Sequence, residues 1–348
     1  MQQALFSPRN LSRRRFAMAL PLLGGGFWAG GAPAHQSSAS LRDSRPLMGT
    51  QVDMSVQGAD GVSLRHGMDQ AYLEMLRLES LMSRYQPGSV VSRINAAAGI
   101  VPVVVPDEVM VVLQSAQRVA QATRGAFDVT VGAFKSWNFG AGEKTVPGAT
   151  EIARQLPLVD ARGLVLDTHA GTAFLARQGM ALDLGGIAKL PILEAGMQVL
   201  RAHGIQNAMI NGGGDVLTQG LWQGRAWRVG VRDPRSPQQL LGVVSLADGG
   251  VVASSGDYER CFFYQGQRLH HVLNPRTGRP TSGVHGVTFV ARDVGTVNGL
   301  GSALMVQGMQ AGRSMSERMA GLAVLMAGQD GSVWQSPAML AVLQPTSA

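Results

Sequence analysis

The stretch Leu269-His270-His271-Val272-Leu273-Asn274-Pro275-Arg276-Thr277-Gly278-Arg279-Pro280 joins an apolar strand to a rigid, basic turn. The two prolines fix φ, and Gly278 permits a backbone conformation that other residues resist. Arg276 and Arg279 carry forked donors that suit phosphate oxygens. An Asn-Pro-x-x-Gly turn also ends ordinary hairpins, so this segment alone leaves both a binding site and a plain strand connection open.

Just before the turn, the sequence predicts a β-hairpin. The runs at 261–264 and 268–273 are strand-like, and Gln265-Gly266-Gln267 is a short connection between them. Because side chains alternate along a strand, His270 and His271 are expected to face opposite sides, one toward a site and the other into the structure. The single cysteine, Cys261, is expected to be a buried strand thiol, and it excludes a disulfide scaffold.

The rest of the chain predicts helices and strands that are segregated rather than regularly alternating. Apolar residues recur at helical spacing over 68–82 and 109–119, and a third helix is predicted over 188–203. Strands are predicted at 208–210, 227–231 and 284–291, then a short helix at 297–307 and a final hairpin over 322–334. This order predicts an α+β fold with mixed sheets.

The N-terminus has the pattern of an export signal. Ser12-Arg13-Arg14-Arg15-Phe16 precedes an apolar run and then Ala32-Pro33-Ala34. This arrangement is typical of a twin-arginine signal peptide cleaved after Ala34, and the run is short and Gly-rich for a membrane span. We therefore expect a signal peptide at 1–34, a polar linker at 35–44 and a periplasmic mature protein. An uncleaved N-terminal membrane anchor is the alternative.

Composition describes an enzyme-sized globular chain. Of 348 residues, 45% are hydrophobic and 15% charged, and no later apolar stretch has membrane-spanning length. Four arginines and no acid precede His35, so the net charge of +7 falls to about +3 without that segment. No Lys/Arg block with interleaved aromatics follows, which argues against a nucleic-acid partner.

Two glycine clusters are candidate phosphate-binding turns. They are Asp183-Leu184-Gly185-Gly186-Ile187-Ala188-Lys189 and Asn211-Gly212-Gly213-Gly214-Asp215, and neither fits a nucleotide fingerprint. The first leads from a strand-like segment into a helix, where free N–H groups and Lys189 would face an anion. Tight-turn packing explains the same residues equally well.

Seven motifs follow one another along the predicted mature chain. They are Arg45–Thr50, Met82–Tyr85, Gly125–Gly132, Asp183–Lys189, Asn211–Asp215, Ser254–Tyr258 and His271–Pro280. In this order the chain resembles the ApbE family of FAD:protein FMN transferases, over a single domain at 45–348. The resemblance implies transfer of FMN from FAD to a Ser or Thr hydroxyl of a partner protein, with AMP released, Mg²⁺ assisting, and the FAD site between the sub-structures.

The resemblance also implies the site residues. Those expected to bind FAD are Met48, Ser83, Arg84, Tyr85, Asp128, Lys189, Val272 and Leu273. His271 is the expected general base, since an imidazole with a pKa near ~6.5 can accept a hydroxyl proton at neutral pH. A structural strand histidine is the alternative for this residue.

The implied metal ligands are Gly186, Asn298 and Ser302, and here the chain departs from the family pattern. Asn298 stands where family members usually carry Asp, and Mg²⁺ prefers carboxylate ligands, so its affinity is expected to fall. Asn274 likewise stands where Asp commonly precedes Pro275.

Three functions are therefore open. The first is an exported flavin transferase that acts on a membrane-bound electron-transfer subunit. The second is a non-catalytic periplasmic protein that binds or delivers FAD, and the third is an FAD pyrophosphatase that uses water in place of the protein hydroxyl.

Overall fold

The structure, a computed structural model, describes residues 39–140, 142, 144–236, 238–319 and 321–346. The predicted signal peptide and residues 35–38 lie outside the described residues. The helices are α1 (Gly61–Met82), α2 (Val90–Ala96), α3 (Asp107–Ala122), α4 (Ala149–Gln155), α5 (Lys189–Ala202), α6 (Leu300–Glu317) and α7 (Pro337–Val342). The strands are β1 (Ala39–Leu47), β2 (Thr50–Gly58), β3 (Val103–Val104), β4 (Leu164–Asp167), β5 (Thr172–Leu175), β6 (Asn207–Gly212), β7 (Asp215–Gln219), β8 (Trp227–Arg232), β9 (Leu240–Leu246), β10 (Gly250–Gly256), β11 (Cys261–Tyr264), β12 (Gln267–His270), β13 (Val284–Ala291), β14 (Ala323–Gly328), β15 (Val333–Gln335) and β16 (Leu343–Gln344).

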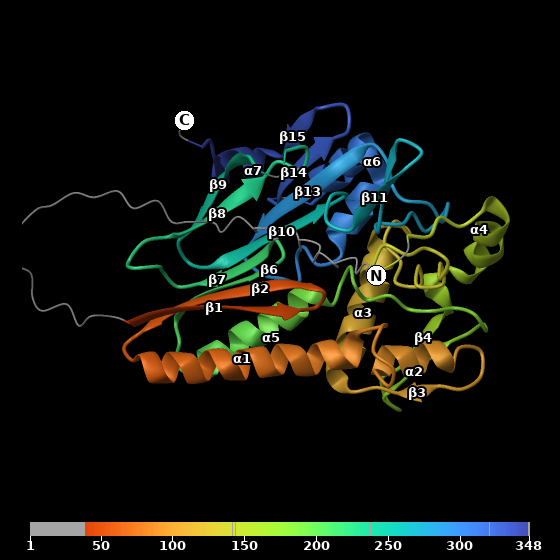
Figure 1. The fold of residues 1–348 in the computed structure, drawn as a ribbon, viewed down its shortest axis with the longest axis horizontal. Coiled ribbons are helices and arrows are strands. Elements are labelled where there is room, and N and C mark those ends of the chain that lie inside the picture. Colours follow the sequence, from red (N-terminus) through yellow and green to blue (C-terminus); the bar gives the residue numbers. More distant parts are fainter. Residues whose placement is uncertain (1–38, 141, 143, 237, 320, 347–348) are drawn as a thin grey trace, which may run out of the picture.

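An eight-stranded sheet organises the fold, in the order β1-β2-β6-β7-β10-β13-β14-β15 (Figure 1). Each neighbouring pair in it is antiparallel. Smaller sheets form from β16-β9-β8, from β3-β5-β4 and from the predicted hairpin β11-β12. Helices and strands are segregated along the chain, so the predicted α+β class is confirmed.

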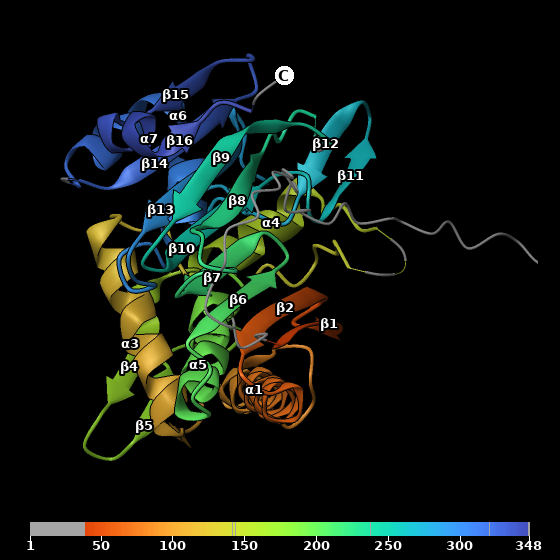
Figure 2. The ribbon, with the colours of Figure 1, turned by 90° about the vertical axis from the view of Figure 1, so that its left-hand side faces the viewer.

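Side-chain alternation divides this sheet between two cores. On one face, Ile210 and Phe289 belong to the main core, which also contains the buried sides of α1, α5 and α6. On the other face, Val252 and Leu325 pack with β8, β9 and α7. Figure 2 shows β8 and β9 apart from α1 and α5, with the sheet between them.

A third, smaller cluster supports the basic turn at 274–280. The cluster contains Phe134, Trp137 and Ile152, and the Trp137 indole N–H donates to the Gly278 carbonyl at 2.8 Å. Gly278 has φ +66°, and a Cβ there would lie 2.6 Å from Ile152 and 2.8 Å from Phe134. The turn therefore requires glycine for its backbone conformation and for its close packing.

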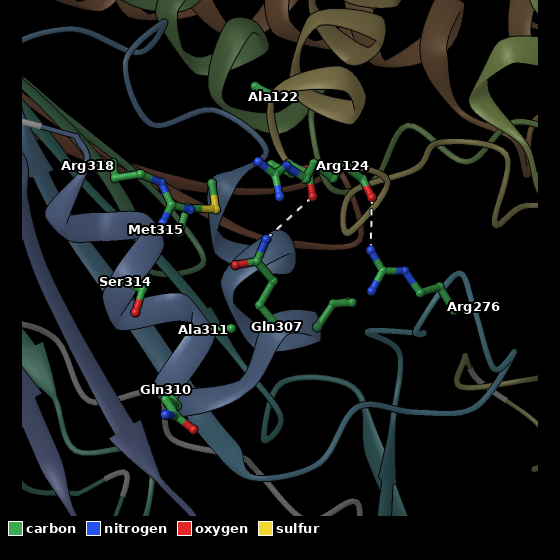
Figure 3. Close-up of a pocket in the computed structure, with 11 residues that line it drawn as sticks. Ala122, Arg124, Arg276, Gln307, Gln310, Ala311, Ser314, Met315 and Arg318 are labelled. Carbon is green, nitrogen blue, oxygen red and sulfur yellow. Dashed lines mark hydrogen bonds between the residues drawn. The ribbon is translucent and has the colours of Figure 1, made fainter.

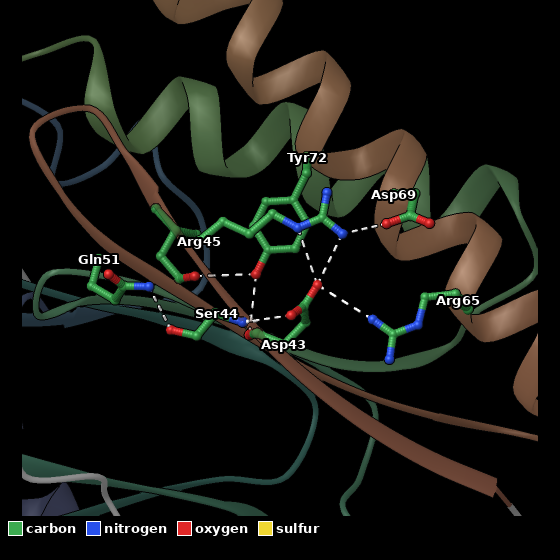
Figure 4. Close-up of polar contacts among 8 residues, drawn as sticks. Asp43, Ser44, Arg45, Gln51, Arg65, Asp69 and Tyr72 are labelled. Carbon is green, nitrogen blue, oxygen red and sulfur yellow. Dashed lines mark hydrogen bonds and ion pairs between the residues drawn. The ribbon is translucent and has the colours of Figure 1, made fainter.

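A polar network holds β1 against α1 (Figure 4). The Arg45 guanidinium lies 2.9 Å from Asp43 and also pairs with Asp69, and it stacks 4.3 Å from the centroid of the Tyr72 ring. The Tyr72 hydroxyl lies 3.1 Å from the carbonyl oxygens of Asp43 and Val52. These contacts fix the strand that leads into the β1–β2 turn.

The structure corrects some predicted boundaries. Ala39–Ser44, expected to be linker, belong to β1, because this segment pairs with β2 along its whole length. The helix expected at 297–307 continues to Glu317, since Gly308 adopts φ +78° and ψ 177° and the helix resumes after this kink. Cys261 is half-buried in β11 rather than fully buried. Within the described residues, no helix combines the length and apolar character needed to cross a membrane.

Candidate functional site

The β1–β2 turn and the segment after β12 meet through Arg260. Met48, at the tip of the turn, has φ +53°, a conformation that costs a non-glycine residue about 1 kcal/mol. Its carbonyl accepts from the Arg260 guanidinium at 3.4 Å, while the Arg260 carbonyl accepts from the His271 N–H at 3.1 Å. Two of the predicted site residues, Met48 and His271, are therefore connected through one arginine.

His270 and His271 have opposite environments, as strand alternation predicts. His270 is fully buried, and its Nε2 lies 2.9 Å from the Thr281 carbonyl. His271 lies just beyond the end of β12, and its side chain is exposed. Of the two, only His271 is accessible to a reacting hydroxyl.

The surroundings of His271 keep its imidazole neutral. Desolvation by the surrounding protein, followed by the positive charges of Arg260 and Lys189, lowers the pKa of His271 to about 4, while Asp183 opposes the shift. The side chain itself is exposed to solvent. His271 is a proton acceptor at neutral pH, but a weaker base than an ordinary histidine.

Lys189 reaches the same region from the start of α5. Its ammonium lies 3.1 Å from Asp215, which also accepts from the Ser254 N–H at 3.0 Å. Asp215 follows the two-residue turn Gly213-Gly214, with φ +65° and +103°, which closes the β6–β7 hairpin. This second glycine cluster is thus a tight turn that positions an acid beside Lys189.

Arg84 contributes a further cation. Its guanidinium donates to Asp183 at 3.0 Å and to the Gly132 carbonyl at 3.2 Å. Asp183 pairs with Arg84 and also acts on the pKa of His271, so the Arg84 loop lies in the same region as His271. Ser83 ends α1 and accepts the Ser89 hydroxyl at its carbonyl, and Tyr85 is 74% exposed with its ring 5.5 Å from the Arg84 guanidinium. An exposed aromatic ring beside a guanidinium is suited to stacking against a planar ligand.

The three predicted metal ligands also come together. A Cβ on Gly186 would lie 3.3 Å from the Ser302 hydroxyl, and the buried Asn298 donates its side-chain N–H to the Ile187 carbonyl at 2.8 Å. Ser302 lies in the first turn of α6. The oxygens of this corner are all neutral, and the described residues contain no cluster of three His, Cys, Asp or Glu side chains that would hold a metal. The donor set does not fit a resident Mg²⁺ ion.

Three predicted residues have mainly structural contacts. Asp128 is buried and accepts from the Thr130 N–H and hydroxyl and from the Ala161 N–H. Its burial raises its pKa, against the lowering effect of these hydrogen bonds. Val272 is buried, and its carbonyl accepts from the Thr281 N–H. Leu273 packs on the cluster around Trp137.

Asn274 organises the basic turn. Its side-chain oxygen accepts from the Arg276 N–H at 2.9 Å, and its carbonyl accepts from the N–H groups of Thr277 and Gly278. Asp would accept the same side-chain hydrogen bond, so this departure from the family pattern preserves the turn. Arg276 donates to the Arg124 carbonyl at 2.9 Å.

Sequence reasoning missed the roles of Asp215, Glu259 and Arg260. In the sequence, Asp215 is the last residue of a glycine cluster whose backbone N–H groups attract attention before its carboxylate does. Glu259 and Arg260 immediately follow the Ser254–Tyr258 motif, and burial raises the pKa of Glu259 against the opposing charges of Arg232 and Lys189. Two charged residues in Tyr258-Glu259-Arg260, directly before a predicted hairpin, could have indicated that their side chains lie near the site.

Solved structures share this architecture. The ApbE protein of Thermotoga maritima matches with a TM-score of 0.81 at 30% sequence identity, covering 88% of this chain and 100% of that chain. The flavin transferase ApbE of Vibrio cholerae matches with a TM-score of 0.76 at 28% identity and the same coverage. The fold thus places the protein in the class of ApbE-like α+β proteins.

Sequence relatives lead to the same class. The ApbE family model matches residues 48–326. An FAD:protein FMN transferase of Klebsiella pneumoniae (strain 342) is 36% identical over 220 residues, covering 62% of this chain and 68% of that protein. One of Treponema pallidum (strain Nichols) is 33% identical over 260 residues, covering 70% and 72%. The chain belongs to the ApbE family, which confirms the resemblance predicted from its motifs.

Proposed function

We propose that the protein transfers FMN from FAD to a Ser or Thr hydroxyl of a partner electron-transfer protein and releases AMP. The observation that carries this proposal is the exposed, neutral His271 in a site that also holds Lys189, Arg84 and Arg260. A neutral base and several cations are what attack on a pyrophosphate requires, since alignment and charge neutralisation dominate phosphoryl transfer. Family membership supports the flavin substrate.

In the proposed reaction, the acceptor oxygen forms a bond to the phosphorus of the FMN half of FAD. The bond from that phosphorus to the bridging oxygen breaks, and AMP leaves with the bridging oxygen. The hydroxyl proton passes to the imidazole of His271. Arg260 holds the backbone at His271 through its carbonyl and thereby orients the base.

We assign the binding roles by the same reasoning. Lys189 and Arg84 neutralise phosphate charge, because each retains donors beyond its carboxylate partner. Met48, Ser83 and Tyr85 contact the flavin nucleotide together with the backbone of Val272 and Leu273, and Asp128 holds the 128–130 turn. Tyr85 contributes a stacking surface, since its ring is exposed.

Magnesium enters this proposal as part of the substrate. Because the corner formed by Gly186, Asn298 and Ser302 lacks a carboxylate, the FAD phosphates would have to supply the charged ligands of the ion. Replacing Asn298 with Asp would add the missing charge.

The proposed setting is the periplasm, reached through a twin-arginine signal at 1–34, with one ApbE-like domain at 45–348. The acceptor is a membrane-bound electron-transfer subunit. Retention of the signal as an N-terminal anchor is the alternative to cleavage after Ala34, and N-terminal sequencing of the exported protein distinguishes the two.

The test combines the purified mature chain with FAD, Mg²⁺ and an acceptor that a matched family member modifies. We expect AMP together with flavin attached to the acceptor, and no attachment when the acceptor hydroxyl residue is replaced by Ala. AMP with free FMN would instead establish a pyrophosphatase. FAD binding without AMP would establish a flavin-binding or flavin-delivery protein.

A further inference from the structure

A cavity lies beside α6, on the side where α3 ends, and it has a volume of about 520 Å³ (Figure 3). None of the residues assigned above to FAD or metal binding lines it. The lining residues are Ala122, Thr123, Arg124, Arg276, Val306, Gln307, Gln310, Ala311, Ser314, Met315 and Arg318. A cavity of this size is in the range of small-ligand sites.

The charge of this cavity is uniformly positive. Arg124, Arg276 and Arg318 line it, and none of the eleven lining residues is acidic. Within the described part of the chain, no carboxylate lies within ion-pair distance of these three arginines. Three guanidinium groups that lack acidic partners are suited to bind phosphate oxygens by forked hydrogen bonds.

Two hydrogen bonds tie the segment after α3 to the other two sides of the cavity, which are α6 and the basic turn. Gln307 donates to the Thr123 carbonyl at 3.4 Å, and Arg276 donates to the Arg124 carbonyl at 2.9 Å, so the carbonyls of the two residues that follow α3 both have partners (Figure 3). Gly308 follows Gln307 in the chain and breaks the helical geometry of α6 with a φ and ψ that essentially only glycine adopts. The second half of α6 is thereby turned relative to the first, and both halves line the cavity.

The remaining surface of the cavity is mixed. Met315 is buried and Val306 half-buried, and they provide an apolar wall, whereas the amides of Gln307 and Gln310 offer both donors and acceptors. An apolar wall, amides and a group of arginines together match a molecule that carries both an organic part and a phosphate.

We propose that this cavity is a binding site for a small organic phosphate of nucleotide size. The site is distinct from the His271 region, and its occupation does not depend on flavin transfer. Arg318 and Arg124 bind the phosphate, and Arg276 adds a further donor to it while keeping its hydrogen bond to the Arg124 carbonyl. The wall of Met315 and Val306 contacts the organic part.

AMP serves as the probe, by calorimetric titration of the mature chain saturated with FAD, so that the flavin site is filled. We expect one equivalent of AMP to bind. Arg318→Gln and Arg124→Gln should each weaken this binding by about tenfold, the usual size of a lost charge-assisted hydrogen bond. Arg313→Gln is the matched control, because Arg313 lies on the same helix but stacks 5.4 Å from Trp334 and does not line the cavity.

Three results would overturn the proposal. These are no AMP binding to the FAD-saturated protein, binding that Arg318→Gln and Arg124→Gln leave unchanged, and binding that Arg313→Gln weakens equally. Inorganic phosphate tests the organic part separately. We expect it to compete with AMP but more weakly, and equal affinity would refute a nucleotide-sized ligand. All of these measurements are independent of transferase activity.

Discussion

Two corners of the candidate site differ in charge. The corner around His271 contains Lys189 and Arg84, each paired with an aspartate, and Arg260, whose guanidinium donates to the Met48 carbonyl, whereas the corner around Asn298 offers only neutral oxygens. Both are held by the 183–189 segment, since Asp183 and Lys189 belong to the first corner and Gly186 to the second. Under the proposed function, side chains would neutralise the phosphates and the substrate would supply the charged ligands of a metal.

Removing the base should give the largest effect on the charged corner. His271→Ala should lower the rate of AMP release by about 10²- to 10⁴-fold, because a positioned base contributes about that much, while FAD affinity stays near that of the wild type. Turnover and FAD titration measure the two quantities. His169→Ala, at an exposed turn, is the control and should leave both unchanged. Full activity in His271→Ala would remove the residue from the mechanism.

Lys189→Met should have the next largest effect. We expect kcat/KM for FAD to fall by roughly 10- to 100-fold, the value of a charge-assisted hydrogen bond to phosphate. The substitution also leaves Asp215 without its lysine, so Lys189→Met combined with Asp215→Asn separates the two roles. If Lys189 contacts phosphate, the double variant stays impaired. Recovery in the double variant would show that Lys189 only pairs with Asp215.

Asn298→Asp tests the neutral corner. The added carboxylate should lower the Mg²⁺ concentration for half-maximal activity by about tenfold, and Mg²⁺ titration in the presence of FAD should show the same change. Asn274→Asp is the matched control, because its side-chain oxygen caps a turn that Asp would also cap. Equal responses of the two variants, or none from Asn298→Asp, would contradict the assignment of this corner.

The pH dependence should give the smallest effect. The folded pKa of His271 is lowered toward about 4, so the neutral base persists well below pH 6.5, and kcat/KM should stay level there and fall only in more acidic buffer. The free energy of unfolding should also decrease in acid, because His271 of the unfolded state takes up a proton at a higher pH than His271 of the folded state. This decrease should occur as the pH falls from about 6.5 toward the folded pKa. Lys189→Met should move the acid limb upward, since a nearby cation is removed. An inflection near 6.5 in the wild type would contradict the lowered pKa.

Periodicity and turn residues predicted most of the fold. The helices at 68–82 and 109–119 and the strand at 284–291 follow from local spacing, and the different environments of His270 and His271 follow from strand alternation. The strand at Ala39–Ser44 was missed because its polar residues read as linker, while its pairing with β2 supplies the structure. The end of α6 was missed because a Gly308 kink is indistinguishable from a helix end in the sequence.

The candidate site was predicted less completely. The ordered motifs predicted site roles for His271, Lys189 and Arg84, but ion pairs such as Lys189 with Asp215 depend on contacts between distant segments, which local spacing does not contain. The hydrogen bond from Asn298 to the Ile187 carbonyl has the same origin. The sequence identified Asn298 as unusual, and the structure shows what its amide does.

The most direct measurement of the central claim is the ratio of AMP released to flavin covalently attached to the acceptor. Wild-type protein and His271→Ala are compared with FAD, Mg²⁺ and the same acceptor, by chromatography of the nucleotides and intact mass of the acceptor. We expect equal amounts of AMP and attached flavin with the wild type, and strong loss of both with His271→Ala. AMP without attached flavin, or attachment that is indifferent to His271, would contradict it.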